Sequence, residues 1–133
     1  MQVSHMLTYS DTVPALSWRG AVEALRQGHL RPRAEMGDML LGPPSAVLLT
    51  RAAIIDGLGF AVKTETVMAG NTASGLPTVQ GAVLLYDSDT GALRAAIEAK
   101  LVTEYKTAGD SVLGAQLLAR PESRHLVIVG AGV

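Results

Sequence analysis

The sequence predicts an α+β domain of about five mainly antiparallel strands with helices, which runs into the first helix and strand of an α/β domain. Three observations lead to this fold class. An apolar helical stripe follows Ser17, five short aliphatic or β-branched runs lie between residues 39 and 98, and an apolar run at 126–129 leads into Gly130, Ala131 and Gly132. A strand followed by Gly-x-Gly is typical of the first turn of a Rossmann domain, although glycine turns after strands have many other structural uses.

The N-terminal part predicts two helical segments. Ser10 precedes a short segment that has Pro14 inside its first turns, and Ser17 is placed as the N-cap of a longer helix that stops near Gly28. Apolar side chains of this longer helix recur at helical spacing, at Trp18, Ala21, Val22 and Leu25. We expect this stripe to pack on a sheet, because an apolar helical face is far more often part of a core than a ligand site.

The middle of the chain changes to the pattern of short strands. Aliphatic and β-branched runs alternate there with Gly, Pro, Asn and Asp, which favour turns. The runs are residues 39–41, 46–50, 59–67, 78–86 and 92–98. Residues 87–91 predict a hairpin turn between the last two, because Gly91 can take a positive φ, and antiparallel neighbours are therefore expected.

A second helix is expected from about Thr107 to just before Arg120, followed by a loop at 121–124 and a strand at 126–129. Helix, short loop, strand and Gly-x-Gly form the beginning of an α/β domain. We therefore divide the chain into residues 1–105, an α+β domain, and residues 106–133, the start of a Rossmann domain.

Composition excludes several functions. The 133 residues carry a formal charge of −1 with no run of one sign, which gives no electrostatic footprint for nucleic acid or an anionic membrane. The chain has no cysteine and three scattered histidines, so no metal site is predicted. The absence of cysteine fits a reducing cytoplasm, and neither a membrane span nor a signal peptide is indicated.

Two basic positions before and within the predicted sheet are candidates for binding an anion. Lys63 stands inside an otherwise apolar strand, where its ammonium must reach solvent or meet an anion. The alternative is an edge-strand lysine that faces water. Arg33, stiffened by Pro32, could hold a carboxylate in bidentate fashion, and the alternative there is a solvated basic turn.

A third candidate anion site is the start of the second predicted helix. Lys106 precedes Thr107 at what we expect to be a helix N-terminus, where unpaired backbone N–H groups and the helix dipole favour anions. The alternative is simple capping, with Thr107 or Ser111 as N-cap and Asp110 as a first-turn acid. No Ser-His-Asp order and no paired carboxylates with acid/base logic are found.

Taken in order, these motifs resemble those of the ornithine cyclodeaminase/mu-crystallin family over nearly the whole chain. The resemblance rests on Pro32-Arg33, Lys63, residues 75–81 (GLPTVQG), 89–91 (DTG), 106–108 (KTA), 118–121 (LARP) and 130–133 (GAGV). It implies a homodimeric NAD- or NADP-dependent enzyme acting on a small amino or imino acid. In that family the N-terminal α+β domain, here residues 1–105, serves substrate binding and dimerisation, and a Rossmann domain follows it.

The resemblance also implies roles for single residues. Arg33, Lys63 and Lys106 match positions that hold the substrate carboxylate. The positions that match cofactor contacts are Thr78, Lys106, Thr107 and the pyrophosphate loop of Gly130, Ala131 and Gly132. The catalytic aspartate of the family is expected beyond Val133, and so is the residue that selects NAD or NADP.

One departure bears on the reaction. Cyclodeaminases of the family usually have arginine where this chain has Lys106, and lysine lacks the planar fork of arginine. The Lys-Thr-Ala form is more similar to the family's imine reductases, which act on cyclic imino acids such as Δ1-pyrroline-2-carboxylate. Ornithine cyclodeamination, a non-catalytic nucleotide and ligand binder, and a dimerisation fragment remain alternatives.

Overall fold

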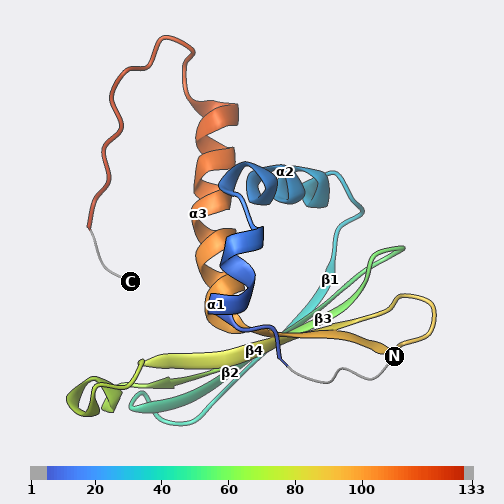
Figure 1. The fold of residues 1–133 in the computed structure, drawn as a ribbon, viewed down its shortest axis with the longest axis vertical. Coiled ribbons are helices and arrows are strands. Elements are labelled where there is room, and N and C mark those ends of the chain that lie inside the picture. The colour runs from blue at the N-terminus through green and yellow to red at the C-terminus, as the bar shows by residue number, and fades with distance from the viewer. Residues whose placement is uncertain (1–5, 131–133) are drawn as a thin grey trace.

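A sheet with helices on one face makes up most of residues 6–130, which a computed structural model describes (Figure 1). Before the sheet come α1 (Tyr9–Thr12), the 3₁₀ turn η1 (Val13–Ala15) and α2 (Trp18–His29). The strands are β1 (Glu35–Leu41), β2 (Ala46–Ile55), β3 (Gly59–Met68), β4 (Val79–Tyr86) and β5 (Leu93–Glu98). The 3₁₀ turn η2 (Asn71–Ser74) joins β3 to β4, and α3 (Ala99–Leu118) follows β5.

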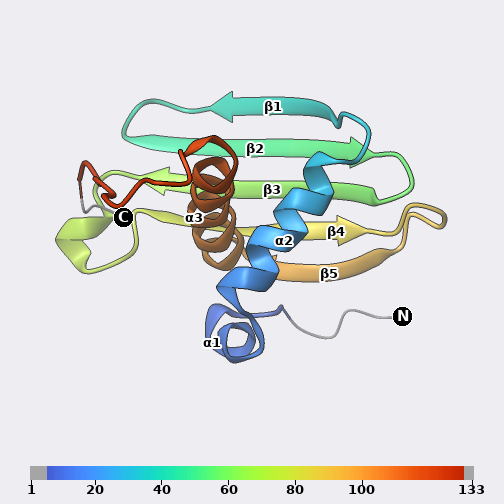
Figure 2. The ribbon, with the colours of Figure 1, turned by 90° about the horizontal axis from the view of Figure 1, so that it is seen from above.

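The five strands form one antiparallel sheet in the order of the sequence, as Figure 2 shows from above. The predicted antiparallel α+β fold is thus confirmed. β1 and β2 extend beyond the predicted runs, because Asp38 and Arg51 lie opposite each other in the register and continue the pairing as an ion pair. β3 is the central strand, so whatever it carries on either face lies in the middle of the sheet.

The predicted hairpin between β4 and β5 is confirmed, and a single carboxylate organises it. Gly91 has a φ of +68°. Oδ1 of Asp87 accepts hydrogen bonds from the Asp89 and Thr90 backbone N–H groups and from the Thr90 hydroxyl, and Oδ2 lies 2.6 Å from Arg94. These donors, the Thr90 N–H first, lower the pKa of Asp87 from its usual 3.8 to about 2.

The hairpin should make stability depend on pH in acid. The folded-state pKa of Asp87 lies below its unfolded value, so its contribution is present above pH 3.8 and is lost as the pH falls towards about 2. We expect Asp87→Asn to lower the urea midpoint at neutral pH and to flatten its decline over this acid range. Asp56→Asn in the turn between β2 and β3 is the control, and an unchanged acid profile in Asp87→Asn would contradict the expectation.

Helix α3 begins earlier than the sequence predicts. It runs without a break from Ala99 to Leu118, so the predicted start near Thr107 is wrong. The polar residues 103–107 suggested a loop, but a stripe at four-residue spacing continues through them, made of Leu101, Tyr105, Gly109 and Leu113. Residue 105 thus lies inside the helix, and the division into domains there stays a prediction.

The apolar stripe of α2 packs mainly on α3, and the prediction that it packs on the sheet is wrong. Ser17 caps the helix as predicted, with its hydroxyl accepting from the Gly20 N–H at 3.1 Å. The Trp18 ring stacks on Tyr105 with centroids 4.2 Å apart. The small Gly109 lets Leu25 approach α3, because a Cβ there would lie 2.6 Å from Leu25 Cδ1. The two helices thus form a second layer.

The predicted strand at 126–129 does not form. Its four side chains are 77–98% exposed, and the segment runs alongside α3 without sheet hydrogen bonds (Figure 1). A buried parallel strand requires neighbouring strands, and residues 6–130 provide none at this position. Gly130 is the last described residue of the predicted Gly-x-Gly turn, since Ala131 and Gly132 lie outside the described residues.

Candidate functional site

The candidate site lies on the face of the sheet that α3 crosses. Lys63 and Glu65 point to this face from β3, since residues two apart in a strand share a face. Lys63 Nζ lies 2.9 Å from Glu65 Oε2 and donates to Thr103 Oγ1 at 3.1 Å. The Thr103 hydroxyl in turn donates to Glu65 Oε1 at 3.2 Å. The three side chains therefore form a closed triangle between β3 and α3.

Glu65 is the buried member of this triangle, with 6% of its surface exposed. The neighbouring strand makes room for it through Gly81, which lies directly opposite in the register. A Cβ on Gly81 would lie 2.7 Å from Glu65 Cα and 2.8 Å from its Cγ. The carboxylate thus lies in a space that the backbone defines.

Lys63 is less enclosed, since 30% of its side chain is exposed. Because β3 is central, the alternative that Lys63 stands on an edge strand is wrong. The lysine does meet an anion, but this anion is the chain's own carboxylate. An ammonium has three donors, and two of them are used here, so one N–H remains for a ligand.

A second ion pair lies beside the triangle on the same face. Arg51 is the register partner of Lys63 and pairs with Asp38 on β1, with Nε and Nη2 at 2.7 and 2.6 Å from its two carboxylate oxygens. This bidentate bond holds the pKa of Asp38 below its usual value and raises that of Arg51. The cation next to Lys63 is therefore already compensated.

Lys106 follows Thr103 by three residues and so lies one turn further on the same side of α3. Its Nζ lies 2.9 Å from Asp110 Oδ2, and the other Asp110 oxygen lies 3.3 Å from His29 Nε2. The Lys106 hydrogen bond is the main cause that lowers the pKa of Asp110, and His29 adds to it. Since 60% of the Lys106 side chain is exposed, the ammonium is accessible.

The proposed helix N-terminus at Lys106 and Thr107 is wrong. Both residues lie in the interior of α3, where backbone N–H groups are used within the helix, so the dipole argument does not apply. The capping alternative is wrong for the same reason, and the Ser111 hydroxyl donates to the Thr107 carbonyl at 3.0 Å. Any anion binding at this position must come from the lysine side chain.

The other two sequence candidates lie at opposite ends of the sheet. Arg33 lies in the exposed loop before β1, whose first residue pairs with Ile54 near the β2–β3 turn. Thr78 is half-buried just before β4, and its carbonyl accepts from the Met68 N–H at 2.8 Å. Lys63 lies between these ends. Of the predicted residues, the structure brings Lys63 and Lys106 to one side of α3 and leaves Arg33 without an ion pair among residues 6–130.

Gly130 is the one described residue of the predicted pyrophosphate loop. Its φ is +96°, and a Cβ there would meet nothing within 4 Å. The positive φ favours glycine at this position, and its place in a pyrophosphate loop stays a prediction. Within residues 6–130 no three acidic or histidine side chains are grouped to hold a metal. In the same part of the chain, no helix has the length and apolarity that crossing a membrane requires.

Sequence reasoning missed the partners of the cations. Glu65 and Thr103 lie close to the predicted cations in the sequence, but the sequence pattern assigns no role to either. The spacing of Lys63 and Glu65 in a strand was the available signal, because it places both on one face. Arg51 and Asp38 gave no comparable signal, since their pairing depends on the register of β1 and β2.

Similar proteins share this architecture. A Δ1-pyrroline-2-carboxylate reductase of Thermococcus litoralis, solved with NADH and L-proline, superposes with a TM-score of 0.74 and 25% identity over 90% of this chain and 39% of that one. An archaeal alanine dehydrogenase dimer with bound NAD gives a TM-score of 0.75 and 28% identity over 89% of this chain and 38% of that one. The fold is thus that of the N-terminal part of NAD-binding enzymes of amino and imino acids.

The family follows from the sequence comparison. Residues 50–133 match the ornithine cyclodeaminase/mu-crystallin family, and the chain belongs to it. A Δ1-pyrroline-2-carboxylate reductase of Paracoccus denitrificans is 61% identical over 126 residues, which cover 95% of this chain and 40% of the relative. The chain therefore spans about two fifths of the length of this relative.

Proposed function

We propose that this chain is the substrate-binding part of an NAD(P)-dependent enzyme that reduces Δ1-pyrroline-2-carboxylate or a closely similar cyclic imino acid. The observation that carries the proposal is the 61% identity to the Paracoccus denitrificans reductase. Lys106 supports the same choice, because it stands where the family's cyclodeaminases usually have arginine. The proposal concerns the whole protein, of which residues 1–133 supply the sheet and α3.

In this proposal the cations hold and orient the substrate. Lys63 gives its free N–H to the substrate carboxylate, and Lys106 and Arg33 complete the contact. Thr78, Thr107 and the loop of Gly130, Ala131 and Gly132 hold the nucleotide, which supplies a hydride when bound. Because the carboxylate is bonded to the imine carbon, the residues that hold the carboxylate would also orient that carbon towards the hydride that the nucleotide would supply.

The test is a comparison of two reactions with the full-length protein. We expect Δ1-pyrroline-2-carboxylate to oxidise NADH or NADPH and to yield proline, with kcat/KM well above that for L-ornithine with NAD⁺. Release of ammonia from ornithine without imine reduction would instead assign cyclodeamination. Tight nucleotide binding with no turnover of either substrate would assign a non-catalytic binder.

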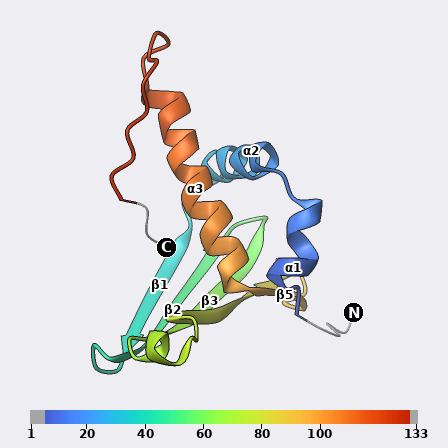
Figure 3. The same ribbon diagram turned by 60° about the vertical axis from the view of Figure 1, so that its left-hand side comes forward.

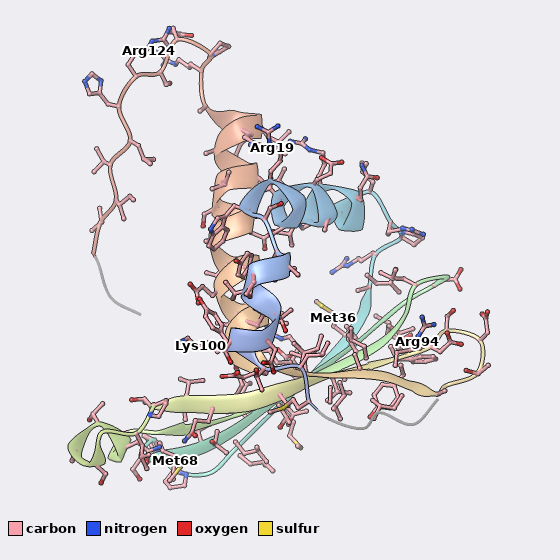
Figure 4. The ribbon with its side chains drawn as sticks, viewed as in Figure 1. Arg19, Met36, Met68, Arg94, Lys100 and Arg124 are labelled. Atoms are coloured by element: carbon pink, nitrogen blue, oxygen red, sulfur yellow. The ribbon has the colours of Figure 1, made fainter. Side chains whose placement is uncertain are left out.

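We further propose that the protein is a homodimer. The two copies meet through the bare face of the sheet, which is the face opposite to the helices. Figure 3 shows the helices on one side of the strands, and Figure 4 shows Met36 on that side and Met68 on the other. Large apolar side chains that are 37–52% exposed occupy the bare face, namely Met39, Leu41, Leu48, Ile54, Phe60 and Met68. Exposed apolar side chains gathered on one face of a sheet are typical of an interface, and the alanine dehydrogenase neighbour is a dimer.

Two adjacent leucines of β1 test this interface. Leu41 pairs with Leu48 on the bare face, whereas Leu40 pairs with Leu49 on the helix face. Leu40 and Leu41 are each more than half exposed. We expect Leu41→Lys to shift the protein from dimer to monomer in analytical ultracentrifugation, because a buried ammonium would lack a partner. Leu40→Lys is the matched control and should stay dimeric. Dimers of equal affinity in both variants would place the interface elsewhere.

A further inference from the structure

Each lysine of the proposed substrate site carries its own carboxylate. Lys63 pairs with Glu65 at 2.9 Å and Lys106 pairs with Asp110 at 2.9 Å, while Asp38 compensates the neighbouring Arg51. The site therefore has donors for an anion but little net positive charge. Arg33 has no ion pair among the described residues, but it lies in the loop before β1 and not beside the triangle.

Glu65 differs from the other two carboxylates because it cannot turn away. Asp38 and Asp110 have side chains 51% and 29% exposed, whereas that of Glu65 is 7% exposed. The Thr103 hydroxyl fixes one of its oxygens, and the space over Gly81 fixes its stem. Its negative charge therefore stays beside Lys63 Nζ when a ligand arrives, in surroundings where charges are screened less than in water.

We propose that Glu65 is a specificity-determining residue, which restricts the site to substrates with a single carboxylate. The proposal rests on the proposed function, in which Lys63 binds the substrate carboxylate. One carboxylate takes the free N–H of Lys63, the donor that the triangle leaves open. Among residues 6–130, the cations nearest in register or helix position, Arg51 and Lys106, are already paired with Asp38 and Asp110. A second carboxylate on a small substrate would therefore meet the negative charge of Glu65 with no further cation there to offset it.

The test compares two four-carbon acids that differ by one carboxylate, butyrate and succinate, as ligands of the full-length protein in calorimetry. We expect the wild type to bind butyrate more tightly than succinate. Glu65→Gln keeps the size and the hydrogen-bond acceptor but removes the charge. It should improve the affinity for succinate relative to butyrate by about tenfold, the effect of one nearby charge at intermediate dielectric. Glu65→Asp should retain the wild-type preference.

Glu23→Gln is the matched control, since it removes the same charge from the exposed side of α2, where Glu23 pairs with Arg26. It should leave the ratio of the two affinities unchanged. If Glu65→Gln left the ratio of the succinate and butyrate affinities unchanged, the proposal would be overturned. It would also be overturned if the wild type bound succinate more tightly than butyrate. That second measurement does not depend on any variant folding. Because binding is measured without turnover, failure of imine reduction would reject the proposed function and leave this result interpretable.

Discussion

Replacing Lys63 by methionine will destabilise the fold and will also weaken substrate binding. The variant leaves the buried Glu65 carboxylate without its cation, and a buried charge that loses its partner is costly. Because Lys63 is partly exposed, we expect a loss of about 2 kcal/mol in the free energy of unfolding, below the full cost for a wholly buried pair. Loss of the charged donor should raise KM by about thirtyfold. Urea unfolding and NAD(P)H-coupled kinetics measure the two effects.

A double variant separates the two effects. Lys63→Met combined with Glu65→Gln removes both charges, so most of the lost stability should return while KM remains high. Recovery of substrate affinity in the double variant would show that Lys63 does not contact the substrate. Equal stability of Lys63→Met and the wild type would show that Glu65 does not depend on the lysine.

Gly81→Ala should be the most damaging of the single-methyl changes in the sheet. The added Cβ would lie 2.0 Å from the Thr64 carbonyl oxygen and 2.7 Å from Glu65 Cα. Both are backbone atoms of the central strand, so they cannot move without disturbing the pairing of β3 and β4. We expect a loss of about 3 kcal/mol, at the upper end for an overpacked position, measured by urea unfolding.

Gly37→Ala is the matched control for this effect. It lies in β1, and a Cβ there would meet nothing within 4 Å. Alanine should be tolerated or should stabilise by about 0.5 kcal/mol, because glycine loses more backbone freedom on folding. Similar losses in both variants would mean that glycine content, and not the close approach at Gly81, determines the stability of the sheet.

Most of the sheet could be predicted from local pattern. Short β-branched runs separated by turn residues locate all five strands, and the Asp87 to Gly91 turn fixes the last hairpin. The bounds of the helices were harder to predict, because polar residues around Thr103 obscure the start of α3. The buried stripe of this helix recurs at every fourth residue and continues through that polar stretch. The run at 126–129 has the composition of a strand, but strand formation also needs neighbours, which composition does not reveal.

The candidate site was predictable in its cations and not in their partners. A lysine within an apolar strand is conspicuous in a sequence, so Lys63 could be singled out before its surroundings were known. The position of Arg51 opposite it follows from the register set by the β2–β3 turn, and the approach of Thr103 follows from the angle of α3 over the sheet. Both are tertiary facts that no local pattern contains.

α3 is a single continuous helix that extends far beyond the sheet. Thr103 lies near its base on the sheet, and the 15 residues to Leu118 extend about 22 Å beyond it. Over this length, a tilt of one degree about the base would displace the far end by about 0.4 Å. One continuous helix thus carries Thr103 of the triangle, Lys106 and the connection to the residues after 118.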